Sequence, residues 1–150
     1  MDNLDIQILE CLKKNARENA SSISAKINLS VSAVIERIRK LESSGVIQQY
    51  SIVLDHQKID MGILAFISIG IEHPKYNESF RQTVLNMRQI QECHYVTGDL
   101  DYILKIIACS TKDLEHVLDE VKAIKGVSTT KTMVVFSTVK NELCVLPQQS

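Results

Sequence analysis

The spacing of apolar residues changes once along this chain, near residue 46, and that change constrains the fold more than any other feature. Before it, apolar residues recur at intervals of three and four, which is typical of amphipathic helices. After it, alternating and continuous apolar runs typical of strands are interspersed with further helical spacing. The sequence therefore predicts a small helical part followed by a part that mixes helices and strands.

The composition is that of a folded chain. Its 150 residues are 45% hydrophobic and 23% charged, with a net charge of -1, which excludes a disordered or repetitive chain. The longest apolar run, residues 63–71, is far shorter than the roughly 20 residues needed to cross a bilayer. The N-terminus lacks the basic and apolar regions of a secretory signal, so we expect a cytoplasmic protein with no membrane partner.

The four cysteines also argue for a reducing compartment. None belongs to a Cys-x-x-Cys pair, so we expect free thiols rather than disulfides or a zinc site. No metal ligands and no cofactor are expected.

Three helices are predicted in the first 45 residues. Leu4, Ile8 and Leu12 share one face of the first helix. The second is short, covers residues 21–27 and offers Ser21 and Ser22 as N-cap residues. The third begins after Ser30, ends at Gly45, and is expected to bury one apolar stripe: Val31, Val34, Ile35, Ile38 and Leu41. A short helix, a tight turn and a longer helix form the helix-turn-helix pattern.

The polar face of the third helix has the character of a DNA recognition helix. Opposite the apolar stripe, short side chains near the N-terminus would let the helix enter the major groove, and basic side chains further along would reach bases or phosphates. The candidate DNA-contacting residues are Ser30, Ser32, Ala33, Glu36, Arg37, Arg39 and Lys40, with Arg37 and Lys40 as the first choices. An exposed face in any small helical bundle carries similar charges, so this pattern alone leaves that alternative open. Because the chain is nearly neutral, DNA binding implies a dimer.

The second part of the chain predicts an α+β unit. Residues 47–54 alternate like a strand and lead into a polar linker. Strand-like runs at 63–71, 90–97, 102–109 and 127–138 are separated by helical patterns at 76–87 and 110–126, and a short extra strand is predicted at 143–146.

The order of these elements is βαββαβ, the split ferredoxin-like motif with two helices on one face of a four-stranded antiparallel sheet. Residues 63–71 are apolar on both sides of the strand. We therefore expect the uncovered face of the sheet to pack against a second subunit.

The loop before the third strand is the candidate ligand site. Gly98 permits a close backbone approach, so that nearby N–H groups can face a carboxylate, while Asp99 or Asp101 can pair with an ammonium group. Both halves of a free amino acid would thus be held. In the alternative interpretation, glycine and aspartate serve only the turn of a hairpin.

Several segments resemble the Lrp/AsnC (feast/famine) family of transcriptional regulators. Residues 29–47 look like its recognition-helix segment, and residues 4–9 resemble its first helix. Residues 96–105 are similar to its effector loop and the strand that follows, and Gly126-Val127 matches the glycine before its last strand. The resemblance extends over nearly the whole chain.

This resemblance implies an α+β fold, with an N-terminal helix-turn-helix (winged-helix-like) domain plus a C-terminal ferredoxin-like βαββαβ domain. The expected boundaries are 1–46 for the DNA-binding domain, 47–61 for a linker strand and hinge, and 62–150 for the effector-binding and oligomerisation domain. The resemblance further implies a homodimer formed through the C-terminal sheets and the linker strand, with dimers assembling further into tetramers or octamers.

The resemblance also implies an effector site between dimers. Gly98 and Leu100 would supply backbone contacts, and Asp101 and Asp99 the charged contact. The expected site is completed by Thr97 as a hydroxyl, Tyr102 as a wall, and, from topology alone, Ser128, Thr129 and Thr130.

We therefore expect a sequence-specific transcriptional regulator whose assembly and affinity for double-stranded DNA respond to a small-molecule effector, an amino acid. One alternative is a ligand-independent architectural DNA-binding protein of the same fold. Another is an enzyme, since ferredoxin-like dimers also host small-molecule chemistry. The four histidines are scattered and no nucleophile, base and acid recur together, so no catalytic residue is expected.

Overall fold

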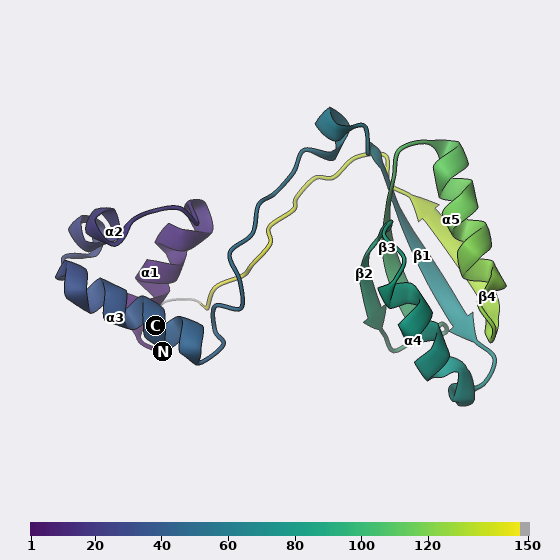
Figure 1. Ribbon diagram of the computed structural model, residues 1–150, viewed down its shortest axis with the longest axis horizontal. Coiled ribbons are helices and arrows are strands. Elements are labelled where there is room, and N and C mark those ends of the chain that lie inside the picture. Colours follow the sequence, from purple (N-terminus) through teal and green to yellow (C-terminus); the bar gives the residue numbers. More distant parts are fainter. Residues whose placement is uncertain (148–150) are drawn as a thin grey trace. The chain divides into compact units, whose positions relative to one another are not determined.

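The computed structural model describes residues 1–147, which form two compact units (Figure 1). The helical unit consists of Met1–Val53 together with the segment that begins at Lys140, and the sheet unit is Leu54–Val139. This division differs from the expected boundaries because the segment after Lys140 belongs with the helices. There, Lys13 Nζ on the first helix donates to Glu142 Oε2 at 2.6 Å. No helix in the described part of the chain is long and apolar enough to cross a membrane.

The helical unit contains the three predicted helices, α1 (Asn3–Lys14), α2 (Ala20–Ile27) and α3 (Val31–Ser43). Helix α3 begins where predicted, because the Ser30 side chain accepts a hydrogen bond from the backbone N–H of Ala33 at 3.2 Å. The N-cap prediction for α2 was wrong. Asn19, with an extended backbone, accepts from the N–H of Ser22, so the helix starts before both predicted caps.

The core of the helical unit buries fewer residues of α3 than the predicted apolar stripe contains. Four fully or almost fully buried residues form it, one from α1, one from α2 and two from α3: Ile8, Ile23, Val34 and Leu41. Ile38 packs against them, but Val31 and Ile35 are exposed. A bundle of three short helices covers only a limited arc of each helix, which leaves the margins of the stripe outside the core.

The sheet unit has the predicted βαββαβ order. Its elements are β1 (Ile63–Ile71), α4 (Asn77–Leu85), β2 (Ile90–Tyr95), β3 (Tyr102–Ala108), α5 (Thr111–Ala123) and β4 (Val127–Val134), with short 3-10 helices at His56–Ile59 and Pro74–Tyr76. The strands are ordered β2-β3-β1-β4, and all neighbouring pairs are antiparallel. The α+β, ferredoxin-like prediction is confirmed.

Several strand predictions were wrong in extent or existence. Residues 47–54 and 143–146 form no strand, β2 ends at Tyr95 rather than at residue 97, and β4 ends at Val134 rather than at residue 138. An alternating pattern makes a strand only where another backbone is available for pairing. In the described residues none of these stretches pairs as a strand, and beyond Val134 only Val135 N still donates to Leu64 O, at 2.8 Å.

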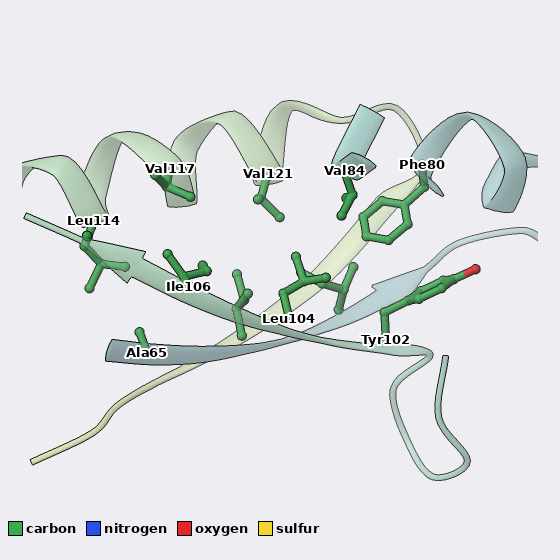
Figure 2. Close-up of a cluster of buried hydrophobic side chains, with 12 residues drawn as sticks. Ala65, Phe80, Val84, Tyr102, Leu104, Ile106, Leu114, Val117 and Val121 are labelled. Carbon is green, nitrogen blue, oxygen red and sulfur yellow. The ribbon is translucent and has the colours of Figure 1, made fainter. Parts of the chain in front are cut away.

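Helices α4 and α5 cover one face of the sheet (Figures 1 and 2). Figure 2 shows the apolar side chains of both helices pointing at those of β1 and β3. The cluster includes Phe80 and Val84 from α4, Leu114, Val117 and Val121 from α5, and Ala65, Leu104 and Ile106 from the sheet. Burial of this apolar surface is the main force that holds the unit together.

Neither α4 nor α5 lies on the second face of the sheet, which we call the open face. The strand register places Met133, Phe66, Lys105 and Glu92 in one row across it, from β4 to β2. Lys105 Nζ donates to Glu92 Oε1 at 3.0 Å, and Glu92 is also paired with His94. Along this row the open face is therefore apolar on β4 and β1 and charged on β3 and β2.

A candidate DNA-binding helix and a candidate effector loop

The predicted DNA-contacting residues all lie on α3 or at its N-cap, and most are exposed. Ser30 and Ser32 are exposed with their hydroxyl oxygens 3.2 Å apart, and Glu36, Arg39 and Lys40 are exposed further along the helix. Ala33 and Arg37 are partly buried. The N-terminal part of the helix is thus narrow and polar, and its middle carries the basic side chains.

Arg37 differs from the other basic residues because its guanidinium is bound to α1. Its Nη1 donates to Asp2 Oδ2 at 2.8 Å and to Asp5 Oδ1 at 2.7 Å. These two carboxylates raise the pKa of Arg37, with Asp5 contributing most. The pKa of Asp2 is lowered, first by the backbone N–H of Asp5 and then by Arg37. The residue chosen first as a DNA contact is therefore already engaged within the helical unit.

Lys26 is paired in a similar way. Glu18 Oε1 accepts hydrogen bonds from Lys26 Nζ and from Ser22 Oγ, the latter at 2.6 Å. The lysine lowers the pKa of Glu18, and Glu18 raises the pKa of Lys26. Of the four basic residues between α2 and the end of α3, only Arg39 and Lys40 have no carboxylate partner among residues 1–147.

The candidate effector loop is held at one residue, Asp101. Its backbone N–H donates to Ile69 O at 2.8 Å, its carbonyl accepts from Val96 N at 2.8 Å, and its side-chain Oδ2 accepts from Ile71 N at 2.7 Å. The bonds with Ile69 and Ile71 fasten the loop to the end of β1, where a register shift lies between Gly70 and Ile71, and the bond with Val96 closes the loop. The second carboxylate oxygen of Asp101 has no hydrogen-bond partner in the described chain.

Gly70 is the point where the loop meets β4, and the sequence-based site did not include it. A Cβ at this position would lie 3.1 Å from Leu100 Cδ2 and 3.3 Å from Thr129 Cβ. Ser128 Oγ donates to the carbonyl of Gly70 at 3.1 Å. The structure thus brings the predicted residues Ser128 and Thr129 to the loop. A glycine inside a strand is itself a signal of close approach, and that signal was available in the sequence.

Thr130 and Tyr102 lie elsewhere. Thr130 is opposite Ile69, which faces the helices, so it is on the other side of the sheet from Thr129. The Tyr102 side chain is 1% exposed and packs on Phe80 beneath α4, as Figure 2 shows. A pocket wall would have to stand at the loop surface, whereas alternation along β3 turns this ring into the core.

The hydroxyl of the buried Tyr102 has hydrogen-bond partners on α4. It accepts a hydrogen bond from Arg81 Nε at 2.9 Å and donates to Asn77 Oδ1 at 3.0 Å. Tyr95 packs against the same ring in a tilted arrangement, with ring centroids 5.0 Å apart. Tyr102 therefore supports the base of the loop from inside the core.

The tip of the loop is open. Thr97, Gly98 and Asp99 are exposed, and nothing lies within 4 Å of where a Cβ on Gly98 would be. Gly98 has φ +127, which residues with a side chain rarely adopt. The backbone N–H groups of Gly98 and Leu100 find no acceptor in the described chain. The loop thus presents free backbone donors beside two carboxylates.

Metal binding finds no support in the described residues, which contain no group of three His, Cys, Asp or Glu arranged to hold an ion. The candidate functional surfaces are a basic helix face in one unit and a donor-and-carboxylate loop in the other.

Comparison with known proteins covers both units. Residues 64–143 match the family described as Lrp/AsnC ligand binding domain, and residues 1–48 match the family described as Winged helix-turn-helix DNA-binding. The chain is 35% identical over 143 residues to the leucine-responsive regulatory protein of Escherichia coli, covering 93% of this chain and 87% of that protein. It is 33% identical to an HTH-type transcriptional regulator of Pyrococcus horikoshii, covering 95% of this chain and 97% of the relative.

Solved structures agree over nearly the full length. The structure of a transcriptional regulator from Neisseria meningitidis in complex with L-Met matches with a TM-score of 0.93 at 28% identity, covering 97% of this chain and 96% of that one. LrpC of B. subtilis matches with a TM-score of 0.83 at 33% identity, covering 93% and 97% of the two chains.

Proposed function

This chain belongs to the Lrp/AsnC family of transcriptional regulators, and from that premise we propose that it binds double-stranded DNA through α3 and changes its DNA affinity when an amino acid binds at the loop of residues 97–101. The proposal joins a helix-turn-helix unit that recognises DNA to a sheet unit that recognises a small molecule.

The observation that carries the effector proposal is that the two oxygens of the Asp101 carboxylate differ in their hydrogen-bond partners. One oxygen accepts the N–H of Ile71 and holds the loop in place, while the other has no hydrogen-bond partner among residues 1–147. A fixed carboxylate with a free oxygen suits an ammonium group. The unpaired N–H groups of Gly98 and Leu100 suit a carboxylate, so the loop offers partners for both ends of an amino acid.

The L-Met complex of the Neisseria regulator supports this class of effector. Because the proposed contacts on this loop are to the amino and carboxyl groups, they are the same for any amino acid. Selectivity among amino acids then depends on the side chains that surround the ligand in the assembled protein.

Assembly is the second part of the proposal. The open face, with the apolar residues Phe66 on β1 and Met133 on β4, suits a second copy of the same sheet, and the dimer would carry two α3 helices to DNA. Such dimers would assemble into tetramers or octamers. An effector held between dimers changes DNA affinity by stabilising one assembly over another, since ligand binding and assembly are thermodynamically linked.

Thermal unfolding against each of the twenty amino acids tests the effector proposal. A ligand that binds only the folded protein, at about 100 times its dissociation constant, adds roughly 2.7 kcal/mol of stability. We expect one or a few amino acids to raise the unfolding temperature by several degrees. The shift should disappear in Asp101→Asn, which removes the charge while keeping an oxygen to accept from Ile71.

A matched control is Glu115→Gln, which removes a carboxylate from an exposed position on α5. It should respond to the same amino acid as the wild type. A shift that survives in Asp101→Asn would refute the loop as the site. No shift with any amino acid would favour the ligand-independent architectural function instead.

DNA binding is tested separately. Selection by the full chain from a random-sequence duplex library should recover a preferred duplex. Sedimentation velocity with that duplex, with and without the effective amino acid, should show a change of assembly. One unchanged assembly, together with altered DNA affinity, would contradict the linkage mechanism.

A further inference from the structure

We infer that Arg37 is a positioning residue: its ion pairs with Asp2 and Asp5 set the orientation of α3 against α1, and Arg39 and Lys40 are left as the cations that meet DNA. The inference rests on the proposed DNA-binding function and assigns separate roles to basic residues on the same helix. We call the three residues Asp2, Asp5 and Arg37 the clamp.

The clamp is built on acceptors that the backbone has already fixed. Asp2 is the N-cap of α1, and Asp5 Oδ2 accepts from its backbone N–H at 3.0 Å. In return, Asp2 Oδ1 accepts from the N–H of Asp5 at 2.9 Å. This capping box holds both carboxylates in place, and Asp5 Oδ1 is left to accept from Arg37. Arg37 therefore meets a rigid site instead of two mobile side chains.

The clamp adds a second attachment between α1 and α3. The first is the apolar contact of the core, where Ile8 and Val34 are both fully buried. Asp5 lies about one turn before Ile8 on α1, and Arg37 lies about one turn after Val34 on α3. Apolar burial is non-directional, whereas charge-assisted hydrogen bonds are directional. Two attachments one turn apart fix the orientation of α3 where the core contact alone would leave it adjustable.

Charge argues against Arg37 as a phosphate contact. If its guanidinium left both carboxylates to reach DNA, two uncompensated negative charges would stand close to the phosphates. The Asp5 side chain is only 15% exposed, so water would replace the lost partner poorly. Arg39 and Lys40 are exposed and have no carboxylate to leave within the described chain.

The test uses the substitution Asp5→Asn, which should change DNA affinity in opposite directions depending on whether Arg37 contacts DNA or positions α3. If Arg37 contacted DNA, Asp5→Asn would remove a competing negative charge and tighten binding to the selected duplex. If the clamp positions α3, Asp5→Asn weakens binding, by about two- to fivefold for the loss of an ion pair of this exposure. Arg37→Gln should weaken binding to a similar degree. The double variant should be no weaker than the weaker single variant, because both changes release the same clamp.

Salt dependence gives an independent readout. Each cation that meets a phosphate contributes about 1 to the slope of log affinity against log salt. Arg39→Gln should therefore lower the slope by about 1, while Arg37→Gln should leave it unchanged. The control is Glu10→Gln, an exposed carboxylate on α1, the helix that carries Asp5, with no hydrogen-bond partner in the described residues. It should bind at least as tightly as the wild type.

Affinities are compared at a temperature where thermal unfolding shows each variant to be folded. Should Arg37→Gln not fold, Asp2→Asn decides, since asparagine keeps the N-cap and removes only the charge. The inference is overturned if Asp5→Asn or Asp2→Asn binds as tightly as the wild type or tighter, or if Arg37→Gln lowers the salt slope as Arg39→Gln does. A wild-type chain that binds no duplex would instead overturn the proposed function, and the inference with it.

Discussion

Replacing Gly126 with alanine should destabilise the sheet unit strongly. Gly126 joins α5 to β4 with φ +94, and its carbonyl accepts from Glu72 N at 2.9 Å. A Cβ added there would lie 2.4 Å from both Cβ and Cγ of Tyr76. The substitution therefore combines backbone strain with a collision that the protein can relieve only by moving Tyr76 or the start of β4.

The two costs can be estimated separately. A backbone conformation rarely adopted by residues with a side chain costs about 1–3 kcal/mol. Forcing a packed side chain to shift costs about 1–3 kcal/mol more. Each kcal/mol lowers the unfolding temperature of a domain of this size by roughly 4–8 °C. The lower end of the combined cost, about 2 kcal/mol, already predicts a fall of about 10 °C.

The assay is thermal unfolding of the full chain, monitored by calorimetry, with Gly98→Ala as the matched control. Gly98 also has a positive φ, +127, but nothing lies within 4 Å of an added Cβ. Gly98→Ala therefore introduces only the backbone strain, and the difference in stability loss between the two variants measures the cost of the collision with Tyr76. If Gly126→Ala lost no more stability than Gly98→Ala, the close approach of Tyr76 would not be a constraint and the estimate would be refuted.

Two further predictions concern single carboxylates. Asp101→Ala should lower the free energy of unfolding in urea by about 1–3 kcal/mol, because the N–H of Ile71 loses its acceptor, while Asp101→Asn should lose much less; equal losses would contradict this role. Hydrogen bonds from Lys105 and then from His94 lower the pKa of Glu92 below its ordinary value of 4.5, so its contribution to stability is present above that pH and is lost as the pH falls through the folded-state value. Unfolding measured across this acid range should depend less steeply on pH in Glu92→Gln, and an unchanged slope would show that the pair with Lys105 contributes nothing.

The elements found correctly from the sequence depend on neighbours along the chain. Ser30 begins α3, and Ser110 begins α5 by accepting from the backbone N–H of Asp113 at 3.0 Å. These caps and the apolar periodicity act within one or two turns, so they are visible in a short stretch of sequence. The order βαββαβ follows from listing such stretches, and antiparallel pairing of the strands follows from that order.

The elements predicted wrongly depend on partners far away. Residues 47–54 alternate as a strand does, yet no strand pairs with them among the described residues. Val31 and Ile35 have the right spacing for burial, but no neighbouring helix covers that arc of α3. In both cases the local pattern is necessary for the structure, and a second element has to complete it.

The sequence by itself determined that this chain has a helix-turn-helix part and a ferredoxin-like part, and it placed a basic helix and a glycine-and-aspartate loop within them. Only the tertiary structure decided what those residues do: Arg37 is bound to the start of α1, Tyr102 is turned into the core, and Gly70 joins the loop to β4. The physical reason is the separation along the sequence over which each kind of interaction acts. Propensity and capping act between residues close in sequence, whereas ion pairs, hydrogen bonds and close packing join residues that only folding brings together.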